Sequence, residues 1–222
     1  MSDYVEYMMH QSYYATCNLD MCSKCVLECP GCQRQDIRSK NKIKNSKSIS
    51  INNFRKLVDY FSAINMCGQI SDPVYHSKFK EILAITNEYP DKKFRVSTAA
   101  HQKNIDWYKD AYSIHGDNVS WRFGLDNLPG EVPEYRIKQN SELVFEAMFL
   151  GAKLSKKVEW QFIVLDFNQH KIEKAKQIAK NNNVDLIFII SDRLRNNSRS
   201  PKELRDKYSA GAKVQVEKLV EM

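Results

Sequence analysis

The chain has 222 residues, 42% of them hydrophobic, so it can bury a sizeable core, and one domain is favoured over two. It holds no run of about 18 apolar residues and does not begin like a signal peptide, so we expect no membrane contact and a cytoplasmic location. The formal net charge is +7, much of it in the basic segments 34–48 and 192–213. Such segments are typical of a solvated surface or of contact with an anionic partner. A nucleic acid stays open as that partner, although no nucleic-acid-binding motif supports it.

Apolar residues follow strand-like and helix-like spacing in turn along the chain. Strands are expected at 4–14, 64–67, 93–97, 119–125, 158–167 and 184–190. Helices are expected between them, at 52–61, 79–86, 104–112, 141–152 and 169–180. This alternation predicts an α/β fold with a mostly parallel six-stranded sheet. Because six units are too few for a closed eightfold barrel, we expect a partial (β/α)6 barrel.

The barrel is predicted to span residues 1–190, and the basic tail 191–222 is predicted to pack on it or extend it. In parallel βα folds the active site lies at the carboxyl ends of the strands. A cysteine-rich loop follows the first predicted strand, and polar segments follow the next four, at 67–76, 97–102, 126–136 and 168–170. We therefore expect all five segments on one rim of the barrel.

Five of the six cysteines fall between positions 17 and 32: Cys17, Cys22, Cys25, Cys29 and Cys32. In a reducing cytoplasm such a cluster favours metal binding or catalysis over disulfides. Structural zinc fits poorly, because only three residues separate the two C-x2-C pairs. The bacterial ferredoxin motif fits only in part, because its first cysteine would fall at Leu19.

The C-x3-C-x2-C set of Cys25, Cys29 and Cys32 resembles the motif of the radical SAM superfamily. Pro30 and Arg34 add a likeness to the branch of molybdopterin-cofactor and peptide-maturation enzymes. The resemblance implies a [4Fe–4S] cluster on three thiolates, with S-adenosylmethionine on the fourth iron. An earlier overlapping set, which uses Cys17 and Cys22, has a less common spacing. Those two residues are then structural thiols or candidates for an auxiliary metal.

The resemblance covers roughly residues 15–190 and implies further cofactor-binding residues. "CGQISDPVYH" stands where the family has a "GGEP" turn that holds the methionine amino group, which points to Gly68, Gln69 and Asp72. The replaced second glycine and the longer turn are departures from the family pattern. "STAAH" follows the third strand and offers Ser97 and Thr98 to the ribose hydroxyls.

Two later segments complete this likeness. "FGLDNLPGEVPEYRI" resembles the family's "SIDG" region, so that Asp126 matches its acid and Arg136 an arginine for the methionine carboxylate. "VLDFNQHKIEKA" resembles a segment that places Asn168 near the substrate or the adenine. No cysteine follows Cys67, so the chain resembles short, phage-type members that lack a C-terminal auxiliary-cluster domain.

The implied activity is reductive cleavage of S-adenosylmethionine at the cluster. The 5′-deoxyadenosyl radical that results abstracts hydrogen from a substrate, for which a nucleotide, a peptide and a protein all stay open. A flavodoxin- or ferredoxin-type reductant is implied as a partner. The alternative is a non-catalytic metal-binding protein, either a ferredoxin-like electron carrier or a structural zinc site. The long βα array favours the enzyme, since an electron carrier does not need it.

Overall fold

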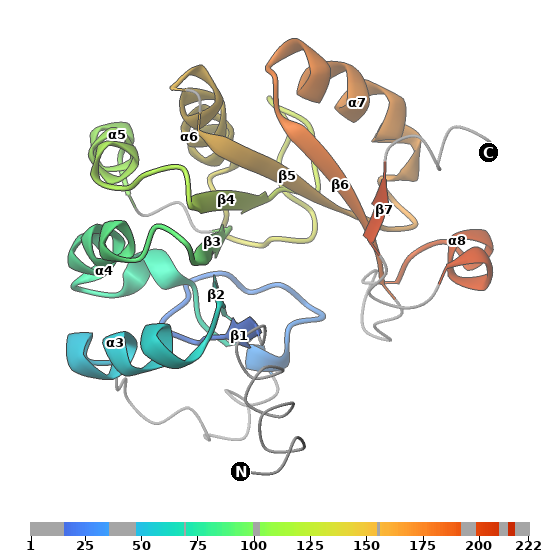
Figure 1. Ribbon diagram of the computed structural model, residues 1–222. Helices are drawn as coiled ribbons and strands as arrows, with labels where there is room; N and C mark the ends of the chain where they lie inside the picture. The colour runs from blue at the N-terminus through green and yellow to red at the C-terminus, as the bar shows by residue number, and fades with distance from the viewer. Residues whose placement is uncertain are drawn as a thin grey trace, which may run out of the picture.

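The computed structural model describes residues 16–35, 48–68, 70–99, 103–154, 156–191, 199–208 and 213–215. Their strands form one sheet in which the spatial order follows the chain order (Figure 1). The strands are β1 Thr16–Asn18, β2 Ala63–Cys67, β3 Lys93–Thr98, β4 Val119–Gly124, β5 Lys157–Val164, β6 Asp185–Ile190 and β7 Lys213–Gln215. Neighbours from β1 to β6 pair in parallel, whereas β7 pairs antiparallel with β6.

Helices connect successive parallel strands and lie on the outer side of the curved sheet (Figure 1). They are α3 Ile51–Tyr60, α4 Phe79–Ile85, α5 Ile105–Ile114, α6 Ser141–Lys153 and α7 Ile172–Asn181, and α8 Lys202–Lys207 follows β6. Short 3-10 turns are η1 Pro73–Tyr75, η2 Thr86–Glu88 and η3 Gln169–Lys171. Because each parallel strand lies beside the next one in the chain, crossovers of one hand place their helices on one face. The predicted partial (β/α)6 barrel with six parallel strands is confirmed.

The two faces of the sheet differ in composition, as strand alternation requires. Toward the helices point large apolar side chains, among them Trp121 and Trp160, both fully buried. Their ring N–H groups donate to His115 Nε2 at 2.8 Å and to the Leu125 carbonyl at 2.8 Å. The inner face instead carries polar residues on β2 to β5: Asn65, Arg95, Arg122, Glu159 and Gln161. The core therefore lies between sheet and helices, and the inner face is left for a ligand.

The ends of several elements differ from the sequence prediction. The predicted strand 4–14 lies outside the described residues, and β1 directly precedes the cysteine loop instead. The strand predicted for 158–167 ends at Val164, because the Leu165 amide donates to Asn168 Oδ1 at 2.7 Å and so begins a turn. No described helix has the length and apolar composition that crossing a bilayer requires.

Candidate cofactor-binding site

A cavity of about 170 Å³ opens at the carboxyl ends of the strands. The loop after β1 contributes all three cysteines of the C-x3-C-x2-C set, Cys25, Cys29 and Cys32. The other predicted site residues that line this cavity are Gly68, Asp72, Ser97, Thr98 and Arg136. Parallel strands bring these segments together because their carboxyl ends share one edge of the sheet. Asp126 and Asn168 do not line the cavity, and Gln69 lies outside the described residues.

The three cysteines lie in apolar surroundings. Leu27, Tyr135 and Ile163 belong to a small hydrophobic cluster that also includes Cys29, with Cys25 and Cys32 packed against it. Burial raises the pKa of the Cys25 thiol to about 12 and that of Cys29 to about 11. A metal must therefore displace their protons in order to bind.

The donor set fits an iron–sulfur cluster. Among the described residues, no group of three or more His, Cys, Asp or Glu side chains is arranged to hold a single metal ion. A [4Fe–4S] cluster places a different demand on its ligands, because each thiolate binds its own iron. Three cysteines around one cavity, in an apolar shell, meet that demand.

Hydrogen bonds fasten the cysteine loop to the turn after β2. Asp20 Oδ1 accepts from the Ile70 amide at 3.2 Å, the Ser71 amide at 3.1 Å and Ser71 Oγ at 2.8 Å. Arg34 Nη1 donates to the carbonyls of Ser23 at 2.8 Å and Ile70 at 2.5 Å. The turn that the resemblance assigns to the methionine amino group is thus fixed against the loop that carries the cysteines.

Cys22 and Cys17 have structural surroundings. The buried Cys22 thiol donates to the Asp72 carbonyl at 3.5 Å, while the Asp72 amide donates to the Lys24 carbonyl at 2.9 Å. Cys17 packs against the main hydrophobic core. Neither residue lines the cavity, which favours the later cysteine set over the earlier one.

Asp72 joins the turn after β2 to the end of β3. Its buried carboxylate accepts from Thr98 Oγ1 at 2.8 Å, from the Ala99 amide at 2.8 Å and from the Val74 amide at 3.2 Å. Asp72 and Thr98 therefore bind each other in the cavity wall. Asp72 also begins the 3-10 turn η1, where the proline at position 73 follows it.

A buried ion pair places Arg136 in the cavity wall. Arg136 Nε lies 2.8 Å from Asp126 Oδ2, and the other carboxylate oxygen accepts from the Ile163 amide at 2.7 Å. The guanidinium lies over Gly124, where an added Cβ would come within 2.7 Å of Arg136 Cζ. Gly124 therefore provides the space that the arginine occupies.

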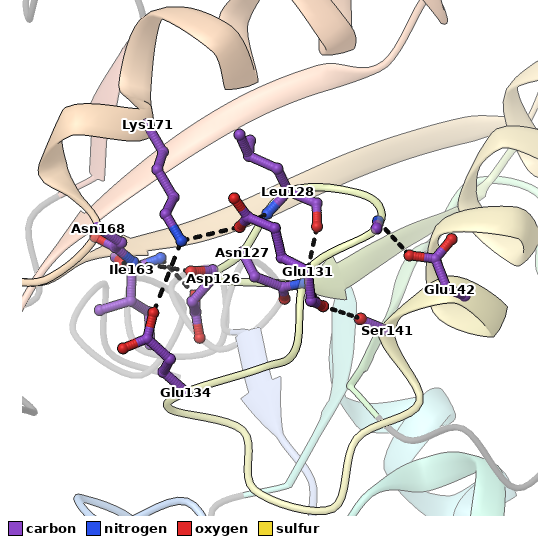
Figure 2. A network of polar contacts seen from close by, with 11 residues as sticks. Asp126, Asn127, Leu128, Glu131, Glu134, Ser141, Glu142, Ile163, Asn168 and Lys171 are labelled. Carbon is purple, nitrogen blue, oxygen red and sulfur yellow. Dashed lines mark hydrogen bonds and ion pairs between the residues drawn. The ribbon is translucent and has the colours of Figure 1, made fainter.

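The loop between β4 and α6 is held in place by a polar network (Figure 2). Glu131 Oε2 accepts from the Leu128 amide at 2.8 Å and pairs with Lys171 Nζ at 2.9 Å. Asn127 Nδ2 donates to the Glu131 carbonyl at 3.1 Å, and Ser141 Oγ donates to the same carbonyl at 3.2 Å. These contacts fix the backbone that carries Arg136 toward the cavity.

Asn168 belongs to this network and is fully buried (Figure 2). Its Nδ2 donates to the carbonyls of Asp126 at 2.9 Å and Ile163 at 3.0 Å. Asn168 thus joins the ends of β4 and β5. In this structure it positions Asp126 from behind the cavity wall.

Among the cavity-lining residues that sequence reasoning missed are Arg122 on β4 and Gln161 on β5. Both occupy inner positions of strands whose outer positions hold large apolar side chains. Polar residues at every second position of an otherwise buried strand are the signal that could have found them.

No protein-family model and no curated protein sequence matches the chain. Among solved structures, SuiB of Streptococcus suis bound to S-adenosylmethionine superposes with a TM-score of 0.70 at 11% identity, over 91% of this chain and 48% of SuiB. For anSMEcpe with bound AdoMet and Kp18Cys peptide the TM-score is 0.52 at 14% identity, over 83% of this chain and 55% of that one. For TYW1 with a lysine-pyruvate adduct bound the TM-score is 0.51 at 12% identity, over 86% of this chain and 71% of TYW1. The chain thus spans about half of SuiB, and it has the fold of the radical SAM enzymes.

Proposed function

We propose that this chain is a radical SAM enzyme that binds a [4Fe–4S] cluster through Cys25, Cys29 and Cys32. One observation carries the proposal: the three motif cysteines and segments from four strand ends line a single cavity. The shared fold supports it, because SuiB was solved with S-adenosylmethionine bound. The cofactor would bind in the same cavity, beside the cysteines.

The residues of the wall suit the parts of S-adenosylmethionine. The Arg136 guanidinium, held by Asp126, suits the methionine carboxylate, since a planar fork of donors matches a carboxylate. The backbone at Gly68 suits the amino group, and Ser97 suits a ribose hydroxyl. The Asp72 carboxylate is already used by Thr98 and Ala99, so it would act by shaping the turn.

When bound and reduced, the cluster would supply the electron that splits S-adenosylmethionine into methionine and a 5′-deoxyadenosyl radical, which takes hydrogen from the substrate. The chain's part is to orient the reactants and exclude water. Leu27 provides an apolar part of the cavity wall, and Ile163 packs in the same hydrophobic cluster. A flavodoxin- or ferredoxin-type protein is the proposed reductant.

We propose a peptide as the substrate class. SuiB was solved with its precursor peptide SuiA and anSMEcpe with the Kp18Cys peptide, and both share this fold. The division into a core of residues 1–190 and a basic tail is likewise a proposal, as is a cytoplasmic location.

The test is anaerobic reconstitution with iron and sulfide, followed by low-temperature EPR of the reduced protein with and without S-adenosylmethionine. We expect a [4Fe–4S]⁺ signal that changes when the cofactor is added, and 5′-deoxyadenosine among the products. Alanine at Cys25, Cys29 or Cys32 should abolish both. Cys17→Ala and Cys67→Ala are matched controls that should retain them, because neither side chain lines the cavity.

The alternative functions give different results in the same experiment. An EPR signal of the cluster that does not change when S-adenosylmethionine is added would indicate an electron carrier. Tight zinc binding with no cluster would indicate a structural site at the cysteines. Unchanged cofactor cleavage in Cys32→Ala would reject the later cysteine set.

A further inference from the structure

The inner face of the sheet brings a charged side chain into the cavity wall. The strand register places Arg122 of β4 between Ser97 of β3 and Glu159 of β5. Arg122 and Ser97 line the cavity, and Gln161, one inner position beyond Glu159 on β5, lines it too. The Arg122 guanidinium therefore lies in the cavity wall together with the neutral hydrogen-bonding residues Ser97 and Gln161.

A single carboxylate faces two arginines on this surface. Arg122 Nε donates to Glu159 Oε2 at 2.7 Å, and Arg122 Nη2 lies 2.6 Å from the same oxygen. Arg95 Nε lies 3.6 Å from that oxygen as well. The three side chains carry a formal excess of one positive charge, and only 10% of the Arg122 side chain is exposed.

The hydrogen-bonding capacity of these arginines is not exhausted by Glu159. Among the described residues, Arg122 Nη2 and Arg95 Nε are buried and have no well-aligned acceptor. A partly buried charge without full compensation is unfavourable, and an oxyanion from a ligand would relieve it. Guanidinium groups match carboxylate and phosphate oxygens in both charge and shape.

The depth of Arg122 separates it from Arg136, the residue proposed to bind the methionine carboxylate. The Arg136 guanidinium lies over Gly124, and Arg122 is two residues earlier on the same strand. At the rise of a β-strand this is about 7 Å further from the rim that carries the cysteines. A group that reaches Arg122 therefore enters deeper than the methionine carboxylate at Arg136.

From this geometry we infer that Arg122, supported by Arg95, binds one oxyanion of the substrate, either a carboxylate or a phosphate. Glu159 orients the Arg122 guanidinium and competes with the incoming anion. The inference rests on the proposed function, since it assigns a substrate group to the cavity in which S-adenosylmethionine would bind.

The test is anaerobic isothermal titration of the reconstituted holo-protein with S-adenosylmethionine present. The probes are inorganic phosphate, glutarate and, as a neutral control, dimethyl glutarate. We expect wild type to bind phosphate or glutarate but not the diester. Arg122→Gln should weaken that binding by about tenfold or more, as loss of a charge-assisted hydrogen bond implies. Arg122→Lys should fall between the two.

The Glu159→Gln variant should raise the affinity for the anion, whereas Arg122→Gln lowers it. It removes the competing carboxylate, so anion binding should become tighter. If the pair of Arg122 and Glu159 were purely structural, Glu159→Gln would not raise the affinity for the anion. Arg55→Gln is the matched control, because Arg55 pairs with Glu88 at 2.5 Å on the helix side of the sheet. Its anion binding should equal that of wild type.

The outcomes separate the possible sources of the anion. A preference for phosphate supports a phosphorylated substrate, and a preference for glutarate supports a carboxylate. The inference is overturned if Arg122→Gln binds phosphate and glutarate with the same affinity as the wild type. It is also overturned by a selective loss of S-adenosylmethionine affinity in Arg122→Gln, measured by EPR, because Arg122 would then contact the cofactor. The failure of the proposed function would look different. The EPR signal of the wild type would then not change when S-adenosylmethionine is added, while Arg122→Gln would still weaken anion binding. That result would reject the proposed function and support the oxyanion site.

Discussion

At the scale of single residues, Gly124 sets the position of the cavity arginine. Its hydrogen is the only substituent that leaves room for the Arg136 guanidinium, which in turn pairs with Asp126. The arginine end is flexible, so a methyl group at position 124 would shift it without forcing the backbone to move. The effect should therefore be on binding more than on stability.

Gly124→Ala is predicted to weaken S-adenosylmethionine binding by about tenfold, because a charged hydrogen bond is lost or misaligned. Equilibrium dialysis of the reconstituted protein measures this, and iron content should stay unchanged. Gly116→Ala is the control, since an added Cβ there would meet Asn87 Oδ1 at an ordinary 3.5 Å. Equal affinity in the two variants would show that Arg136 does not contact the cofactor.

His115 gives a second prediction at this scale. Its Nε2 accepts from the Trp121 ring N–H at 2.8 Å, and its Nδ1 contacts the Gly116 carbonyl at 2.9 Å. Burial lowers the pKa of this imidazole, so the folded protein keeps it neutral. The stability it contributes is present above the pKa of an unfolded His, about 6.5, and is lost as the pH falls toward the lower folded value.

Urea unfolding at several pH values between about 7 and 5 tests this, across the range where an unfolded His titrates. The wild type should lose stability as the pH falls, and His115→Gln should lose less over the same range. Parallel pH profiles for the two proteins would contradict the assignment.

Sequence reasoning predicted the cysteines and Arg136 as site residues because each belongs to a family pattern with fixed spacing, and the structure places them around one cavity. It could not find the ion pair of Arg122 with Glu159, because that pairing depends on the register between β4 and β5. Nor could it show that Asn168 binds backbone carbonyls, since its partners lie on other segments. Spacing predicts which residues are candidates, and only the fold shows which side chains meet.

At the scale of elements, the turn after β2 depends on Asp20. This one carboxylate oxygen accepts three hydrogen bonds from Ile70 and Ser71. Asp20→Ala leaves these donors without their acceptor, which should lower the free energy of unfolding by about 1–3 kcal/mol. Hydrogen exchange at Ile70 and Ser71 should quicken, and Asp20→Asn should be milder because it keeps an oxygen there.

Asp59→Ala is the matched control for this prediction. Asp59 accepts from the exposed Tyr89 hydroxyl at 3.0 Å on the helix side, far from the turn. Exchange at Ile70 and Ser71 should be unaffected by this change. Protection that persists in Asp20→Ala would show that Arg34 alone holds the turn.

Most element boundaries followed from periodicity, and the structure shows which side chains begin three of the helices. Ser50, Asn104 and Asn140 cap the helices that follow them, each accepting from a backbone amide in the first turn. The end of β5 was wrong by three residues, because its apolar run continues into a turn that Asn168 closes. A side-chain contact of this kind competes with the strand pattern, and composition alone does not reveal it.

At the scale of the whole molecule, β7 covers the far edge of the sheet. It pairs antiparallel with β6, with Phe188 opposite Val214. A chain that ends at residue 208 should expose that edge, lower the melting temperature and quicken amide exchange along β6. Cleavage of S-adenosylmethionine should persist, because the described residues that line the cavity lie between Cys25 and Gln161.

Val214→Pro tests the same pairing without shortening the chain, since proline cannot donate to a ladder and is disfavoured inside a paired strand. It should reproduce the faster exchange on β6 while retaining the basic tail. Loss of S-adenosylmethionine cleavage in the truncated chain but not in Val214→Pro would indicate that the tail takes part in the reaction.

The order of the strands also bears on how the protein folds during synthesis. Each parallel strand pairs with the one made just before it, so the sheet can grow from β1 onward without waiting for distant segments. Every described residue that lines the cavity lies in the range from Cys25 to Gln161. The ligand-binding pocket, with the contacts of Ile163, Asn168 and Lys171 that hold the Asp126–Arg136 pair in place, can therefore take shape while residues 172–222 are still emerging from the ribosome. The strand β7 then covers the edge of a sheet whose pocket is already built.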